Sequence, residues 1–224
     1  MTSRLAAVRR LGWVGLFAAS FALVEASVVI YLRALYYPGG FAFPLQAMAP
    51  GHLGVELGRE AATIVMLIAV GVIAGRSRWE RLGAFLVGFG AWDILFYGWL
   101  KVLLGWPVTL YDWDILFLLP IPWIGPVIAP VAIAAALTLL GTLMALRVAG
   151  ERPFQPQLVS WLCAIGGTAL LLISFMMDTD AGLHNALPAP YRYDLLGAGL
   201  FLYAAGYVVA CRAGSRAAEN TVRE

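Results

Sequence analysis

The stretch Leu53–Gly75, LGVELGREAATIVMLIAVGVIAG, joins a charged beginning to a long apolar remainder. The part after Glu60 carries no charged residue. A helix needs about 20 mostly apolar residues to cross a hydrocarbon layer ~30 Å thick, so this stretch predicts a membrane-spanning helix. Glu56, Arg59 and Glu60 then lie near one end of that helix, where a charge is costly and needs a partner or a function.

Five further apolar runs have a similar length, and the whole chain has the composition of a membrane protein. It is 62% hydrophobic and 12% charged, whereas soluble domains carry about 25% charged residues. We therefore predict a single all-α membrane domain over residues 1–224, a six-transmembrane-helix bundle in a lipid bilayer. The spans are expected at about residues 11–35, 53–75, 82–104, 124–148, 158–177 and 193–211. The net charge of +2 indicates no nucleic-acid partner.

The N-terminal segment Met1–Arg10 has the positive charge of a signal peptide. The apolar run behind it, however, contains Glu25 and lacks a clear small-residue cleavage site. We therefore interpret this run as a retained first span.

The Lys and Arg residues predict the orientation of the spans. Eleven of the 15 fall before the first run, between the second and third, between the fourth and fifth, or after the sixth: Arg4, Arg9, Arg10, Arg76, Arg78, Arg81, Arg147, Arg152, Arg212, Arg216 and Arg223. With six spans these segments share one side, and short loops rich in Lys and Arg stay in the cytoplasm. We expect a bacterial-type inner (plasma) membrane with both termini cytoplasmic. Most acidic residues then fall in or beyond the outer half.

The beginning of the second run places three candidate ligands on one helix face. His52, Glu56 and Glu60 repeat at a spacing of four, so their side chains lie one above another. An imidazole and two carboxylates suit Zn, Mn or Fe, and a divalent metal is therefore one hypothesis. The alternative is that Arg59 and other cations neutralise these acids structurally.

The third run carries a polar stripe at the same spacing of four, formed by Asp93, Tyr97 and Lys101. One interpretation is a charged path from the outside to the middle of the membrane. The other is a set of helix–helix hydrogen bonds, with Lys101 extending its side chain to the interface.

The first run adds Glu25, which is expected to face the bundle because no charged residue lies within one helical turn of it. We predict that Glu25, Glu56, Glu60 and Asp93 form one acidic centre. These four are the candidate catalytic residues, with Arg59, Tyr97 and Lys101 in support. The candidate metal ligands are His52, Glu56, Glu60, Asp93 and His184.

Further acids lie in the outer connections: Asp112, Asp114, Asp178 and Asp180. Asp178 and Asp180 with His184 could together hold a divalent cation near the surface. The interpretation that we favour is that these acids cap loops and are solvated.

The connection between the third and fourth runs is irregular. Its segment Pro120–Pro130 contains four prolines, which disrupt helices. We predict a short interfacial or re-entrant helix over Trp113–Leu119, followed by a bent entry into the fourth span. The alternative is an ordinary proline-rich loop at the level of the lipid head groups. The pentapeptide WDILF occurs at 92–96 and again at 113–117. Because the flanks differ, we favour a shared local role, with Trp at the interface and Asp turned toward protein, over a duplication.

Small residues predict where the helices pack closely. The glycines expected at such contacts are Gly54 and Gly58 in the second run, Gly88 and Gly90 in the third, Gly166 and Gly167 in the fifth, and Gly197 and Gly199 in the sixth.

The sequence lacks the common catalytic signatures: a Gly-x-Ser-x-Gly elbow, a Walker loop, a dinucleotide-type glycine motif and Cys-x-x-Cys. Three functions remain. The first is a metal-binding or acid–base membrane enzyme with a buried carboxylate and histidine site facing outward. The second is an ion- or proton-coupled transporter. The third is a non-catalytic subunit or assembly factor, so that partners would be a larger membrane complex or a homo-oligomer. The inner halves of the spans carry few polar residues, which favours the enzyme.

Overall fold

The computed structural model describes residues 2–41, 48–177, 179 and 190–223. Within these residues, six helices are long and apolar enough to cross a membrane, which confirms the predicted all-α, six-span membrane protein. They are α1 (Thr2–Tyr36), α2 (Pro50–Ala74), α3 (Arg78–Leu104), α4 (Ile128–Ala149), α5 (Leu158–Met176) and α7 (Tyr193–Arg223).

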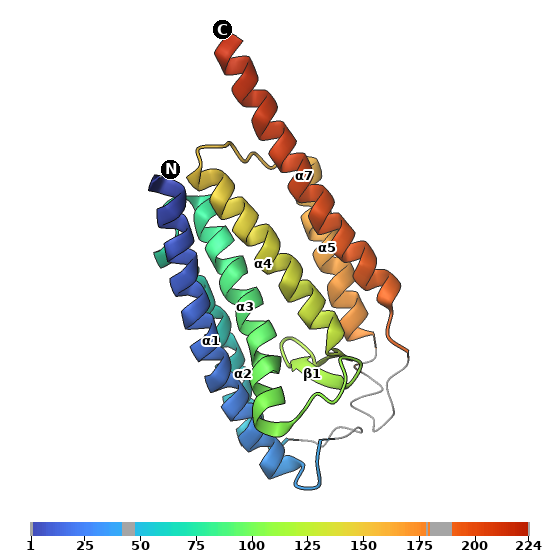
Figure 1. The fold of residues 1–224 in the computed structure, drawn as a ribbon. Helices are drawn as coiled ribbons and strands as arrows, with labels where there is room; N and C mark the ends of the chain where they lie inside the picture. The colour runs from blue at the N-terminus through green and yellow to red at the C-terminus, as the bar shows by residue number, and fades with distance from the viewer. Residues whose placement is uncertain (1, 42–47, 178, 180–189, 224) are drawn as a thin grey trace.

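The helices form two groups of unequal size (Figure 1). Helix α3 lies at the centre of the larger group, where it packs against α1, α2 and α4. Helices α5 and α7 pack mainly on each other, and they meet the larger group through α4 and the strand β2 (Trp123–Pro126). Both termini lie at one end of the bundle, and the short sheet lies toward the other end (Figure 1).

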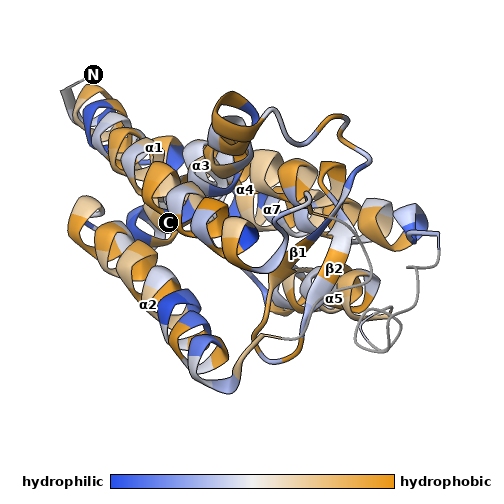
Figure 2. Cartoon of the chain, turned by 90° about the horizontal axis from the view of Figure 1, so that it is seen from below, coloured by the Kyte–Doolittle hydropathy of each residue, from blue (hydrophilic) through white to orange (hydrophobic). Residues whose placement is uncertain are grey.

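Apolar residues are frequent along the helices, as Figure 2 shows by colour, and many large ones are exposed on the helix surface. Ile73 is 83% exposed, Phe201 70% and Ile165 65%. Large apolar side chains at such exposure on every helix would be unfavourable in water, and they indicate a lipid environment.

The predicted interfacial helix over Trp113–Leu119 is wrong. Residues Trp113–Phe117 form a strand, β1, which pairs antiparallel with β2. Aromatic and β-branched residues favour extended backbone, and the prolines of the intervening turn cannot continue a helix. The chain therefore folds back on itself, and β1 and β2 together form a hairpin over Trp113–Pro126. Helix α4 begins at Ile128, later than the expected span start near residue 124.

Two helices, α1 and α7, extend well beyond the spans expected from the sequence. Helix α1 begins at Thr2 and α7 continues to Arg223, well beyond the apolar runs. Hydropathy marks only the part of a helix that lies in hydrocarbon. Polar residues outside it can continue the same backbone hydrogen bonds, so the apolar run does not mark where α1 begins or where α7 ends.

Glycines decide how closely α3 approaches α4. A Cβ at Gly83 would lie 2.7 Å from the carbonyl oxygen of Gly141, and a Cβ at Gly141 would lie 2.7 Å from that of Gly83. Gly90 meets the backbone of Ala134 in the same interface. At the Gly83–Gly141 contact, the two turns can touch only because both residues lack a side chain.

The predicted packing glycines are confirmed in part. Gly90, Gly167 and Gly199 lie against a neighbouring helix, and Gly88 and Gly166 meet side chains more loosely. Among the described residues, nothing lies within 4 Å of a Cβ added at Gly54, Gly58 or Gly197, so the helix contacts predicted for them are not found there. A repeat of small residues cannot show which face of a helix meets protein and which meets lipid.

The Gly141→Ala substitution is expected to destabilise the bundle by about 1–3 kcal/mol, because the added methyl group must push α3 and α4 apart. The measurement is the melting temperature of the purified protein in nanodiscs. Gly98→Ala is the matched control, since Gly98 lies in α3 and a methyl group added there would have nothing within 4 Å of it. An equal melting temperature for the two variants would contradict the close α3–α4 contact.

Candidate functional site

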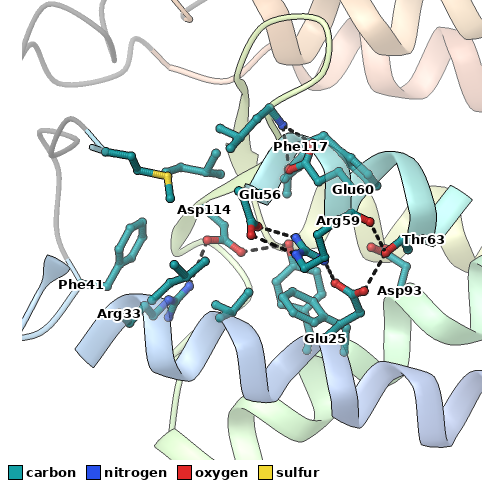
Figure 3. Close-up of a pocket in the computed structure, with 18 of the residues that line it drawn as sticks. Glu25, Arg33, Phe41, Glu56, Arg59, Glu60, Thr63, Asp93, Asp114 and Phe117 are labelled. Carbon is teal, nitrogen blue, oxygen red and sulfur yellow. Dashed lines mark hydrogen bonds and ion pairs between the residues drawn. The ribbon is translucent and has the colours of Figure 1, made fainter. Parts of the chain in front are cut away.

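A cavity of about 150 Å³ lies between α1, α2, α3 and β1, toward the end of the bundle that carries the sheet (Figure 3). Its wall contains five carboxylates and two guanidinium groups: Glu25, Glu56, Glu60, Asp93 and Asp114, with Arg33 and Arg59. The four acids predicted to share a centre therefore do so. They come from three different helices, and the hairpin adds the fifth.

Arg59 is the central cation of this site. Its Nε donates to Glu56 at 3.0 Å, its Nη2 also donates to Glu56, and its Nη1 donates to Glu25. Thr63 donates its hydroxyl to the other oxygen of Glu25 at 2.7 Å. Both carboxylates are buried. This two-sided ion pair joins α1 to α2, two helices that otherwise touch little.

Glu60 attaches the hairpin to α2. Both of its carboxylate oxygens accept from the backbone N–H of Leu118, at 2.9 and 3.0 Å. Leu118 directly follows β1, so the acid satisfies a backbone donor at the point where the strand ends. Glu60 is 5% exposed and makes no ion pair among the described residues.

The second cation, Arg33, belongs to the hairpin side of the cavity. It donates to Asp114 at 3.0 Å, and Tyr97 donates its hydroxyl to the other oxygen of Asp114 at 3.2 Å. The Arg33 guanidinium also lies over the rings of Trp106, at 3.8 Å, and Phe41, at 4.4 Å. Arg33 is thus held by one charge and two aromatic faces.

Asp93 differs from the other four acids. It lies deep inside the protein, yet its side chain borders the cavity and is partly accessible from it. Among the residues that the structure describes, its carboxylate makes no hydrogen bond and no ion pair. The other four acids are each held by an arginine or a backbone N–H, so Asp93 is the carboxylate free to interact with something that enters.

Two predicted site residues lie elsewhere. His52 is exposed and shares a hydrogen bond of 2.6 Å with the Tyr36 hydroxyl. Lys101 is exposed and donates to the carbonyl oxygens of Gly105 and Pro107, which caps the end of α3. His184, together with Asp178 and Asp180, falls outside the described residues.

In the described part of the chain, no three His, Cys, Asp or Glu side chains come together in a group that could hold a metal ion. The guanidinium of Arg59 occupies the place between Glu25 and Glu56. A metal at this centre stays a prediction.

The sequence prediction missed Arg33 and Asp114. Asp114, expected to be a solvated loop acid, is 4% exposed and bonded within the site, so that expectation is wrong. Asp112 does cap its loop, since it accepts from the N–H of Val108 and the hydroxyl of Thr109. The available signal was the repeated WDILF: both of its aspartates, Asp93 and Asp114, turn to the same cavity. The expected interfacial Trp is not seen at Trp92, which is buried.

Burial raises the pKa of Asp114 to about 6, and this effect outweighs the attraction of Arg33. The folded protein therefore binds this proton more readily than the unfolded chain. Its contribution is most favourable below about pH 4 and is lost as the pH rises to about 6. We expect the melting temperature of the wild type to fall relative to that of Asp114→Asn over this range. A pH-independent difference would contradict the assignment.

Between α1, α2 and α3, the described residues show no polar continuation of the cavity toward the end that carries the termini. On the side of the cavity that faces the termini, an apolar cluster containing Ala18, Ala22 and Leu67 fills the space between α1, α2 and α3. Val14 and Val87 fill the space beyond it. The next ion pair, Arg10 with Glu80 at 2.6 Å, lies at the far end of the bundle. The polar groups of the site therefore lie toward the sheet end of the bundle and do not continue to the other end.

Comparison of the chain with protein-family models, with curated proteins and with solved structures gives no match. The function must be inferred from the site.

Proposed function

We propose that this protein is a membrane-embedded enzyme that carries out acid–base chemistry in the polar cavity, with Asp93 as the group that exchanges the proton. The observation that carries this proposal is the contrast between Asp93 and its neighbours. A carboxylate in apolar surroundings is costly unless it is paired, and proteins keep such a group where it has a use.

The neighbouring residues have distinct supporting roles in this proposal. Glu25 and Glu56 fix the position of Arg59, which has five N–H donors and uses three of them in these bonds. The remaining donors can form hydrogen bonds to an acceptor atom of a substrate. Glu60 holds the hairpin over the cavity through Leu118.

The one-sided cavity favours an enzyme over an ion- or proton-coupled transporter, because the apolar clusters interrupt a polar route through the larger helix group. In the orientation expected from the Lys and Arg distribution, the cavity faces the periplasm. A role as a subunit of a larger complex has no specific contact in its favour.

Carbodiimide labelling tests the role of Asp93 without knowledge of the substrate. A hydrophobic carbodiimide takes a proton from a carboxylic acid and couples to it, and it reacts poorly with acids held by arginine. We expect Asp93 to be the main modified residue in peptide mass spectrometry. Glu25 is the internal control, because Arg59 and Thr63 hold it. Modification of Glu25 in preference to Asp93 would overturn the proposal.

Comparative profiling tests the chemistry itself. Lipid extracts and periplasmic metabolites are compared between cells that produce the wild type and cells that produce Asp93→Asn. We expect at least one compound to be converted only by the wild type. Asp112→Asn, the same substitution in an acid outside the cavity, is expected to match the wild type. Identical profiles for all three would remove the enzyme proposal.

The metal version of the enzyme is tested by elemental analysis of the purified protein. Stoichiometric Zn, Mn or Fe that is lost in Glu56→Ala and Glu60→Ala would support it. Metal-free protein that still converts its substrate would rule out the metal version and retain the acid–base version.

A further inference from the structure

A second, apolar space lies between the two helix groups. One part, of about 170 Å³, is lined by residues of α3, α4, α5, α7 and the hairpin, among them Phe89, Ile133 and Leu172. A further part, of about 240 Å³, is lined by the next turns of the same four helices, among them Leu86 and Leu140. Tyr203 borders both parts. The two parts follow one another along α4 and have Tyr203 in common, and they are called the interhelical crevice.

The crevice is long enough for a hydrocarbon chain. On α4 its lining runs from Pro130 to Met144, which corresponds to about 21 Å at 1.5 Å per residue. This length exceeds ~15 Å, half of a ~30 Å hydrocarbon layer. Helices α4 and α7 touch each other only sparingly along it. In a bilayer, an apolar space of this shape is filled by a chain rather than by water.

The polar groups of the crevice are mostly satisfied internally. Thr168 and Tyr203 share a hydrogen bond of 2.8 Å between their hydroxyls. The indole N–H of Trp123 has no acceptor in the described part of the chain, and its nitrogen is buried away from the surface of the space. Asp93 is the exception, because it borders the crevice and has no partner among the described residues.

The crevice ends at the proposed catalytic site. Asp93, Leu116 and Phe117 border both the crevice and the polar cavity. A chain that fills the crevice therefore presents its head group to Asp93. The functional carboxylate lies at the boundary between a polar and an apolar compartment, which is where the reactive part of an amphiphile would lie.

The charges of the cavity select the head group. The two arginines are each committed to carboxylates: Arg33 to Asp114, and Arg59 to Glu25 and Glu56. Neither Asp93 nor Glu60 forms a contact ion pair among the described residues, although Arg59 attracts Glu60 from a greater distance. The rings of Trp92, Phe96 and Phe117 also border the cavity. Unpaired carboxylates with aromatic faces suit an ammonium group and repel a phosphate or a fatty-acid carboxylate.

We infer that the ligand of this site is a long-chain amphiphile with a cationic ammonium head, whose chain occupies the interhelical crevice and whose head lies against Asp93 beside the polar cavity. This inference rests on the proposed function, because it gives the substrate class of the same site.

Binding of three amphiphiles with the same chain and different heads tests the inference. The probes are hexadecylamine, hexadecanol and hexadecanoate, and the affinity is measured by native mass spectrometry of the protein in detergent. We expect the amine to bind at least about tenfold more tightly than the carboxylate, a difference of roughly 1.4 kcal/mol. Asp93→Asn should remove the preference for the amine while the chain still binds.

A second pair of variants tests the place of the chain. Leu172→Trp fills the crevice and is expected to weaken all three probes by about tenfold, or roughly 1.4 kcal/mol. Leu162→Trp is the matched control on the same helix, since Leu162 is 59% exposed and lies outside the crevice lining. Leu172→Phe serves in its place if Leu172→Trp does not fold.

Equal affinity for the three heads, a preference for hexadecanoate, or an amine preference that survives Asp93→Asn would overturn the inference. So would equal binding by the Leu172 and Leu162 variants. These outcomes leave the carbodiimide result unaffected, so that the substrate class can fail while the acid–base role of Asp93 stands. Failure of Asp93 to react with carbodiimide, with amine binding intact, would instead overturn the proposed catalysis.

Discussion

Replacement of Arg59 by leucine is expected to lower the free energy of unfolding by about 2–4 kcal/mol, because it leaves Glu25 and Glu56 buried without a counter-ion. Removal of one partner from a buried pair typically costs about 3–5 kcal/mol, and the estimate is reduced because the Arg59 side chain is 23% exposed. The melting temperature in nanodiscs should fall by roughly 5–15 °C.

Two further variants show whether the loss comes from the unpaired charges. Arg10→Leu removes an arginine with the same 23% exposure from a pair with a single acid, Glu80, and it should cost less. The triple variant Glu25→Gln, Glu56→Gln and Arg59→Leu removes the whole charge set and should recover much of the loss, since neutral replacements of buried ion pairs are often tolerated. A triple variant less stable than Arg59→Leu would contradict this account.

Asp93→Asn is expected to raise the stability of the protein, by about 1–2 kcal/mol. The substitution keeps the shape of the side chain and replaces a charge that has no partner among the described residues by a neutral amide, and a buried unpaired charge costs more than a buried neutral polar group. Stability is expected to rise on substitution when the original residue is retained for function at the expense of stability. A purely structural aspartate would give the opposite sign.

Glu25→Gln is the matched control for this second prediction. It also removes one carboxylate from the wall of the same cavity, but that carboxylate accepts bonds from Arg59 and Thr63. Its melting temperature should fall while that of Asp93→Asn rises. If both melting temperatures fall, the Asp93 carboxylate stabilises the fold, and the proposed proton exchange loses its main support.

The polar cavity was predictable from the sequence to a limited degree. An acid inside an apolar run must turn toward protein, and this rule identified Glu25, Glu56, Glu60 and Asp93 as members of one centre. The rule gives no information on pairing. Arg59 pairs with Glu25 because of how α1 lies against α2. The backbone N–H of Leu118 donates to Glu60 because of how the hairpin lies against α2.

Residues outside the spans could not be assigned in the same way. His52 and Lys101 have the right spacing on their helices, but spacing gives only the relative direction of side chains and not the neighbour that each meets. Both residues lie where the helix reaches the surface. Asp114 and Arg33 lie close to the ends of their elements, where hydropathy does not distinguish a solvated charge from one covered by a hairpin.

The sequence alone determined the number of spans, the membrane environment and the presence of acids that must face protein, because the cost of polar groups in hydrocarbon acts on each segment separately. The tertiary structure decided which secondary structure the same residues adopt and which contacts they make. WDILF is helical at 92–96 and extended at 113–117, since the first copy continues a long helix, while the second is followed by prolines and pairs with β2. Only that pairing brings Asp114 to the cavity that Asp93 reaches from α3, because contacts distant in sequence outweigh the local preference of five residues.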